Sequence, residues 1–285
     1  MIKLVYTIAL LLGLQVSQTA QAQNEQVTLH VPNFVRPLVE KWVAEYQKTN
    51  TQVDFQFKSG KSQDNELNSI SFVTDGNDGV FFARYAVLPV TTKQSEVAER
   101  IGSHRLNAKR LKALFFVKDQ EQDAATAQQY HIYTGNSQNS ASRFYAAYFG
   151  EAHADYKGKK ISGDDSFLNV AISRDPLGVT INSLSNLFNL ETRQLHEDLA
   201  LLPLELDKQG REVLGEGRLD EIITLLERQH YNEIPVGKAG LVYDHRNALL
   251  RDFVHWVLTH GTQYVHEYGL LQLPTKDLAQ NTNKL

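Results

Sequence analysis

The order of hydrophobic patterns between residues 27 and 57 constrains the fold of this chain more than any other feature. Apolar residues alternate with polar ones over 27–31, recur at helical spacing over 35–46 and alternate again over 53–57. These periods predict a half-buried strand, an amphipathic helix and a second strand. Because short connections join them, we expect a parallel strand pair with a helical crossover. Open α/β sheets bind ligands at the loops that follow such strands, here residues 32–34 and 58–62.

The rest of the chain continues to alternate between strand and helix patterns. A β-rich apolar run over 79–90 predicts a buried strand that leads into a crossing segment. Asp165 is placed to cap a short helix, and the polar residues after Leu278 predict a frayed tail. We expect further strands over 130–134, 179–181, 199–204 and 240–243, and helices over 106–115, 140–149, 166–172, 219–229 and 248–265.

Composition excludes several classes of protein. The chain has 285 residues, 42% of them hydrophobic, which is enough for one or two globular domains. Its net charge of -4 gives no electrostatic reason to bind nucleic acid or an anionic membrane. It has no cysteine, so disulfides, thiol nucleophiles, cysteine-bound metals and a lipid anchor on an N-terminal cysteine are all excluded.

The N-terminus has the three parts of a secretory signal peptide. Lys3 precedes an apolar run over 4–14, and the small-residue signal Ala20-Gln21-Ala22 follows. An apolar run of this length is too short to span a bilayer, and a buried N-terminal helix is the alternative. We expect residues 1–22 to be a signal peptide cleaved after Ala22. Export without disulfides favours the bacterial periplasm.

A run of small polar residues between Gly135 and Arg143 opens into a predicted helix. Unpaired backbone N–H groups and the positive end of the helix dipole would then face outward together, which suits a small anion. The loop Ser59-Gly60-Lys61-Ser62 offers a second site of this kind, because Gly60 permits close backbone approach. Ordinary helix caps and turns remain the alternative explanation for both segments.

Catalysis has little support in the sequence. Asp164 and Asp165 could act as paired carboxylates, with His131 as a further candidate, but such a pair more often caps a helix. The chain has no nucleophile elbow, P-loop or dinucleotide-binding glycine motif. Four histidines lie near the C-terminus without the spacing of a zinc motif, so we expect no metal site and no cofactor. We therefore do not expect an enzyme. The four histidines are His245, His255, His260 and His266.

Several segments in fixed order support a resemblance to a known family. They are residues 27–34, 59–62, 140–148, 234–236, 251–258, 261–263 and 268–274. In this order and spacing the chain resembles the phosphate-binding branch of the periplasmic solute-binding proteins of ABC importers. The resemblance implies an α/β, two-lobed periplasmic binding protein fold of type II, with a mixed sheet flanked by helices in each lobe. It also implies two crossing segments as a hinge and an inner-membrane ABC permease as partner.

The sequence departs from that family at the ligand site. The family holds phosphate with an aspartate in the first lobe and an arginine before its Ser-Gly-Thr turn. Here Phe81-Phe82-Ala83-Arg84-Tyr85 and Gly135-Asn136-Ser137 stand in those places. Without the aspartate, selection of protonated phosphate over other oxyanions should weaken. Arg84 or Arg143 would restore positive charge if its side chain faced the cleft.

We therefore expect a monomeric, exported binding protein for phosphate or a related small oxyanion. Residues 24–92 with 237–285 would form lobe 1 and residues 93–236 lobe 2, with crossings near Thr91 and Val236. A sensor or scaffold with an altered or lost ligand site is the main alternative, and a secreted hydrolase is a weaker one. The expected ligand-binding residues are Asn33, Ser59, Gly60, Ser62, Arg84, Ser137, Asn139, Ser140, Ser142 and Arg143.

Overall fold

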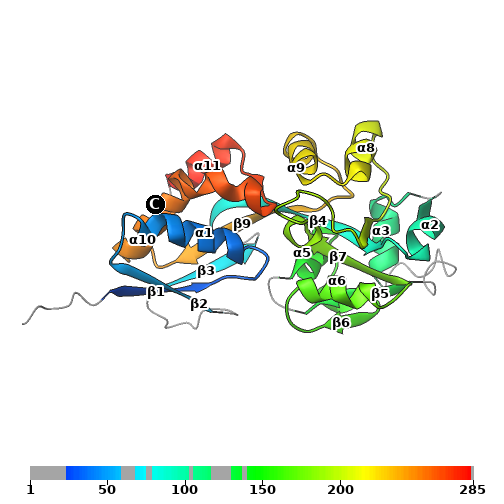
Figure 1. Cartoon of the computed structure of the whole chain (residues 1–285), viewed down its shortest axis with the longest axis horizontal. Coiled ribbons are helices and arrows are strands. Elements are labelled where there is room, and N and C mark those ends of the chain that lie inside the picture. Colours follow the sequence, from blue (N-terminus) through cyan, green and yellow to red (C-terminus); the bar gives the residue numbers. More distant parts are fainter. Residues whose placement is uncertain are drawn as a thin grey trace, which may run out of the picture.

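The computed structural model describes residues 24–58, 68–74, 79–102, 105–116, 130–136 and 140–283. Two lobes, each a sheet flanked by helices, lie side by side and are joined through the long strand β4 (Figure 1). No helix among these residues is long and apolar enough to cross a bilayer. The predicted signal peptide lies outside the described residues. Of the expected ligand-binding residues, Ser59, Gly60, Ser62, Ser137 and Asn139 also lie outside them.

The first three elements form as the hydrophobic periods predict. Strand β1 (Glu25–His30) leads through α1 (Arg36–Gln47) to β2 (Val53–Lys58), and the two strands pair in parallel with Val27 opposite Phe55. Strand β3 (Ser69–Thr74) pairs with the other edge of β1. Strand β1 lies between β2 and β3, and its Thr28 and His30 are buried along with its apolar residues. The expectation of a half-buried first strand was therefore wrong.

Strand β4 (Val80–Thr92) belongs to both lobes. Its first half, to Ala86, pairs with β9 (Val236–Tyr243), and its second half, from Val87, pairs with β7 (Gly178–Ser183) and β8 (Leu199–Leu201). The strand order along the sheet is β2-β1-β3-β9-β4-β7, followed by β5 (His131–Gly135) and β6 (Lys159–Ile161). This change of partners makes β4 and β9 the connection between the lobes (Figure 1).

Helices cover the sheet of lobe 2 on several sides (Figure 1). Four of them, α3, α5, α6 and α9, correspond to helices that the sequence predicts, whereas α2, η2, α7 and α8 were not expected. Their bounds are α2 (Glu96–Gly102), α3 (Ala108–Phe115), α5 (Ala141–Tyr148), η2 (His153–Asp155), α6 (Ser166–Ser173), α7 (Leu184–Leu187), α8 (Lys208–Glu216) and α9 (Leu219–Arg228).

The C-terminal segment differs from its prediction in two ways. The single helix expected over 248–265 is divided into α10 (Ala248–Thr259) and the 3-10 helix η3 (Gly261–Tyr268). The break has a tertiary cause, since the indole of Trp42 lies against Gly261 and donates to its carbonyl oxygen at 2.8 Å. After β10 (Leu271–Gln272) the chain forms α11 (Thr275–Thr282). The frayed tail was therefore wrong for this helix, which is fixed where Asn281 Oδ1 accepts from Phe81 N at 3.1 Å.

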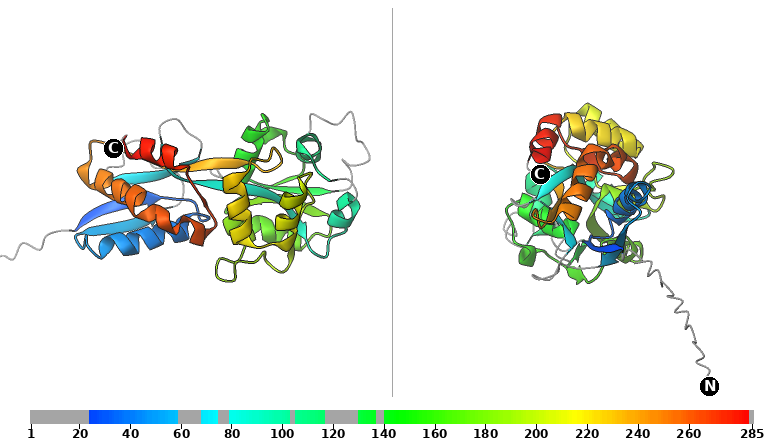
Figure 2. Two further views of the ribbon diagram at one scale, coloured as in Figure 1. Left: turned by 90° about the horizontal axis from the view of Figure 1, so that it is seen from above. Right: turned by 90° about the vertical axis from the view of Figure 1, so that its left-hand side faces the viewer.

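The C-terminal segment also ties the two lobes together. Between η3 and α11 it runs along the side of lobe 1 that faces lobe 2 (Figure 2). Arg193, which has a φ of 61°, donates to Asp220 and to the carbonyl oxygens of His266 and Glu267. Glu227 of α9 accepts from the ring of His266 at 2.7 Å. Contacts of one segment with both lobes limit how freely the lobes can move.

Candidate functional site

Three aromatic rings connect the two lobes at β4. Phe34, in the loop after β1, lies 5.8 Å from Tyr85 between ring centroids, and Tyr85 lies 4.8 Å from Phe144 of α5. Tyr85 is buried and stands just before the point where β4 changes partners. We call Phe34, Tyr85 and Phe144 the aromatic bridge. It brings together the strand-end loop of lobe 1 and the first turns of α5 in lobe 2, which are two of the regions in which we expected ligand-binding residues. The expected loop at residues 59–62 lies outside the described residues.

Three of the expected ligand-binding residues, Asn33, Arg84 and Arg143, each directly precede a ring of the aromatic bridge in sequence. Asn33 precedes Phe34 and is exposed, with its carbonyl oxygen accepting from Arg36 N at 3.2 Å. Arg143 precedes Phe144 and is partly buried in the first turn of α5.

The two serines at the start of α5 are occupied within the protein. Ser140 caps the helix, because its hydroxyl accepts from Arg143 N at 3.3 Å. Ser142 accepts from Gly135 N at 2.8 Å. Their side chains are 2% and 0% exposed. Both serines thus shape the turn into α5, which is the alternative that the sequence left open for this segment.

A carboxylate already occupies the N-terminus of α5. Asp165 Oδ2 accepts from Ala141 N at 2.6 Å, while its Oδ1 is buried without a hydrogen-bond partner among the described residues. A Cβ at Gly135 would lie 2.3 Å from Oδ1, so only glycine leaves room for this carboxylate. Burial raises the pKa of Asp165 to about 7, with a further rise from nearby Asp164 and an opposing effect of the Ala141 N–H. Asp165 takes the position in which we expected an external anion.

The expected helix cap on α6 was assigned to the wrong aspartate. Asp165 makes no capping bond to α6, whereas Asp164 Oδ1 accepts from Ser166 N at 2.8 Å. The two carboxylates therefore serve different helices and do not form an acid/base pair. His131, the third catalytic candidate, is exposed and its Nδ1 lies 2.7 Å from Asp175 Oδ2. These positions give no support to hydrolysis.

The turn that enters α5 is held from two further sides. His153 Nε2 lies 2.7 Å from the carbonyl oxygen of Gly135, and burial lowers the pKa of His153. Tyr156 donates to the carbonyl oxygen of Ser142 at 2.7 Å. With Asp165 in place, lobe 2 organises this helix terminus from its own side chains.

Arg84 does not lie beside the aromatic bridge. Successive residues of a strand point to opposite faces of the sheet, so Arg84 and its neighbour Tyr85 diverge. The guanidinium of Arg84 donates from Nε to the carbonyl oxygen of Gln272 in β10 at 2.9 Å, and burial lowers its pKa. The expected role of Arg84 required a cleft-facing side chain, and in the structure its Nε is engaged by the backbone of β10. Arg143, in the first turn of α5, remains the other candidate arginine.

Sequence reasoning missed the residues that join the lobes. Tyr85 lies in an apolar run without a distinguishing pattern, and the sequence indicates only a loop at Phe34. Their positions in the chain offered one usable signal, because both lie where predicted strands end or cross. Among the residues that the structure describes, no group of three or more histidine and acidic side chains is placed to hold a metal ion.

Comparison with solved structures identifies the fold. A protein from Clostridium perfringens described as a phosphate ABC transporter substrate-binding protein, solved with bound phosphate, matches with a TM-score of 0.59 and 12% identity over 88% of this chain and 100% of that chain. An ABC-type phosphate transport receptor from Vibrio cholerae matches with 0.58 and 11% over 87% and 100%. The CcmR regulatory domain of Synechocystis PCC6803 in complex with 2-PG matches with 0.51 and 10% over 82% and 95%.

These similarities define the architecture of the chain. It has the two-lobed fold of periplasmic binding proteins, as the family resemblance implied. The fold is shared by transport proteins and by a regulatory domain, and the solved neighbours named above are not described as enzymes. No protein-family model matches the sequence, and no curated protein matches it either.

Proposed function

We propose that this protein is an exported solute-binding protein that captures phosphate or a related small oxyanion between its lobes. It would deliver the anion to an inner-membrane ABC permease from the periplasm, as a monomer without a lipid anchor, after removal of residues 1–22. Lobe 1 would comprise residues 24–92 and 237–285, and lobe 2 residues 93–236. The observation that carries the proposal is the aromatic bridge, because it connects the loop after β1 with the first turns of α5, two of the regions that hold expected ligand-binding residues.

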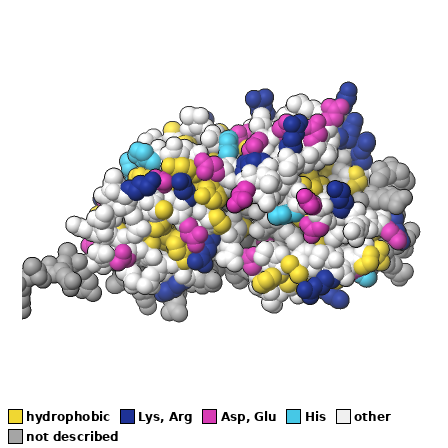
Figure 3. Space-filling view, in the orientation of Figure 1, with side chains coloured by type: hydrophobic (Ala, Val, Ile, Leu, Met, Phe, Trp, Pro, Cys, Tyr) yellow, Lys and Arg dark blue, Asp and Glu magenta, His cyan; other side chains and the backbone are white. Residues whose placement is uncertain are grey.

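The charge distribution agrees with local capture of the anion. Acidic and basic side chains are interspersed on the face shown in Figure 3, and the net charge is -4. The overall field therefore does not attract anions. Arg143 would supply the main positive charge beside the bridge. Further hydrogen bonds would come from Asn33 and from the loops that contain Ser59, Gly60, Ser62, Ser137 and Asn139.

A sensor or scaffold is the second candidate, and Asp165 favours it. When ionised, its carboxylate at the N-terminus of α5 repels a second anion at the same position. A cleft organised by its own aspartate would keep the two-lobed shape without needing phosphate. The regulatory domain among the neighbours shows that this fold also serves outside transport.

Thermal shift of refolded protein separates the two candidates. Unfolding and refolding first removes any carried-over anion, and phosphate, sulfate and molybdate are then added separately. A ligand present at 100 times its dissociation constant stabilises the folded state by about 2.7 kcal/mol. Import predicts such a shift with one of these anions, and predicts that Arg143→Gln reduces it.

The matched control is Arg174→Gln, which removes the same charge from an exposed position on lobe 2. It should leave the shift unchanged. No shift with any of the three anions would contradict the import proposal and support the sensor or scaffold. An equal loss in both variants would show that net charge, and not Arg143, controls binding.

A further inference from the structure

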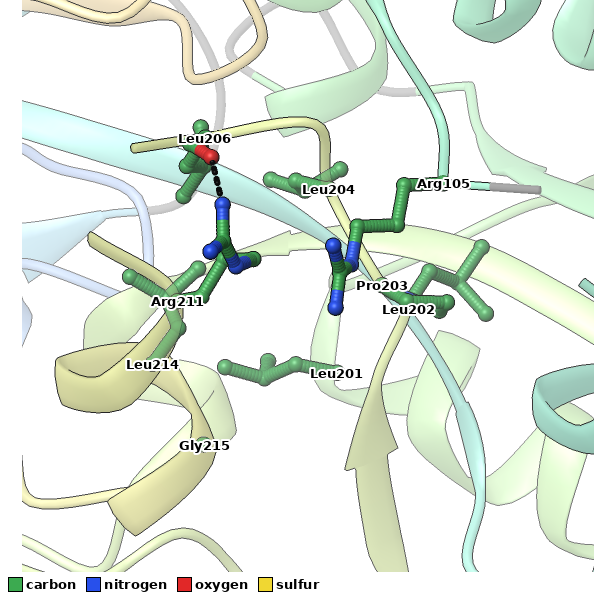
Figure 4. Close-up of a pocket in the computed structure, with 9 residues that line it drawn as sticks. All are labelled: Arg105, Leu201, Leu202, Pro203, Leu204, Leu206, Arg211, Leu214 and Gly215. Atoms are coloured by element: carbon green, nitrogen blue, oxygen red, sulfur yellow. Dashed lines mark hydrogen bonds between the residues drawn. The ribbon is translucent and has the colours of Figure 1, made fainter. Parts of the chain in front are cut away.

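Lobe 2 contains a pocket that is distinct from the aromatic bridge. It has a volume of about 260 Å³ and opens where the chain between β8 and α8 passes Arg105 (Figure 4). Six of its lining residues are leucine or proline, so most of its wall is apolar. They are Leu201, Leu202, Pro203, Leu204, Leu206 and Leu214.

Two arginines enter this apolar pocket from opposite sides. Arg211 projects from α8 and Arg105 from the segment before α3, and both guanidinium groups reach the space between Leu201 and Leu204 (Figure 4). Arg211 donates from Nη1 to the carbonyl oxygen of Leu206 at 2.5 Å, which fixes one end of its guanidinium. Two cations that share an apolar wall repel each other unless a negative charge lies between them.

No carboxylate within the described part of the chain pairs with Arg105 or Arg211. The acidic side chains next to the pocket in sequence have other partners. Glu205 accepts from Asn107, and Asp207 caps α8 by accepting from Gly210 N at 2.7 Å. Glu212 pairs with Lys208. The protein therefore places two positive charges at this pocket and directs the neighbouring negative charges elsewhere.

We propose that this pocket is a second binding site, which takes an aliphatic monocarboxylate. Each guanidinium can bind a carboxylate through two parallel N–H groups, and the leucines would cover the hydrocarbon chain. A fully hydrated oxyanion such as phosphate would satisfy the arginines but leave the apolar wall exposed to water. This inference is independent of the proposed function, because it uses none of the residues of the aromatic bridge.

Isothermal titration of the mature chain with octanoate tests the site. Octanoate should bind with one site per chain, and acetate, which lacks the hydrocarbon chain, should bind at least ten-fold more weakly. Arg105→Gln should weaken octanoate binding at least ten-fold. The guanidinium of Arg105 makes no hydrogen bond or ion pair to a described residue, so this change should not disturb folding. Arg174→Gln is the matched control and should bind octanoate as the unchanged protein does.

The competition result given below would overturn the inference, as would any of three titration results. They are an absence of octanoate binding, equal binding by Arg105→Gln, and equal affinity for acetate and octanoate. Competition distinguishes this site from the proposed anion cleft, since phosphate at a concentration that stabilises the protein should leave octanoate affinity unchanged. Displacement of octanoate by phosphate would place both ligands in one site and would likewise overturn it. Loss of phosphate binding with retained octanoate binding would contradict only the proposed function.

Discussion

Replacement of Asp165 by asparagine should change how the stability of this protein depends on pH. In the folded state the pKa of Asp165 is raised from 3.8 to about 7, chiefly by burial. The carboxyl group therefore holds its proton more tightly in the folded chain than in the unfolded chain. The protonated carboxyl group therefore contributes its full share of the unfolding free energy below about pH 4, and this contribution is lost as the pH rises through about 7.

The structure sets the size of this effect. Three units of pKa correspond to about 4 kcal/mol of unfolding free energy at 1.36 kcal/mol per unit. Asp165 is 5% exposed, so solvent screens the effect little. The N-terminal dipole of α5 favours the ionised form by up to about 2 kcal/mol. We therefore expect a loss of about 2 to 4 kcal/mol between pH 4 and pH 8.

Urea unfolding at several pH values measures the change directly. Asp165→Asn cannot ionise, so its stability relative to the unchanged protein should rise by about 2 to 4 kcal/mol from pH 4 to pH 8. Glu191→Gln removes an exposed carboxyl group of the same lobe and serves as the control. Parallel stability curves for Asp165→Asn and the unchanged protein would refute the assignment of a proton-holding carboxyl to this site.

Other changes test the packing of lobe 2 and its link to lobe 1. Gly158→Ala should destabilise the protein by more than about 2 kcal/mol. The φ of Gly158 is +80°, and the new Cβ would lie 2.1 Å from the carbonyl oxygen of Ile132. An unchanged urea midpoint would contradict this. Tyr145→Phe should stabilise it by about 1 kcal/mol, because the buried hydroxyl has no hydrogen-bond partner in the part of the chain that the structure describes. A lower urea midpoint would contradict this. Arg193→Ala should speed amide hydrogen exchange around His266, because the guanidinium of Arg193 donates to the carbonyl oxygen of His266. Unchanged exchange would show that this hydrogen bond does not stabilise the contact between the lobes.

Local patterns predicted the elements whose own residues determine them. The alternation and helical spacing over 27–57 produced β1, α1 and β2 with the expected parallel pairing. Strand β4 was visible as an apolar run, because it is buried along most of its length. The end of α10 was not visible, since Trp42 sets it from more than two hundred residues away. A hydrophobic period cannot report such a contact.

The candidate site depended even more on distant contacts. The sequence Asp164-Asp165-Ser166 suits a helix cap, but the structure turns Asp165 towards α5, which lies earlier in the chain. Alternation would place Arg84 and Tyr85 on opposite faces, yet an irregularity in the β4–β9 register after Phe81 hides from the sequence which face each takes. The positions of the strand ends, which the sequence shows, thus predicted where the site would lie. The contacts of its side chains could not be predicted, because they depend on tertiary packing.

The distance between the lobes, with and without phosphate, tests the proposed function most directly. The chain has no cysteine, so Thr51→Cys on lobe 1 and Arg174→Cys on lobe 2 permit specific spin labelling at two exposed positions. Hinge closure over a bound anion predicts that phosphate shifts and narrows the distribution of distances between the labels. A distribution that is the same in the refolded protein with and without phosphate would contradict capture of phosphate between the two lobes.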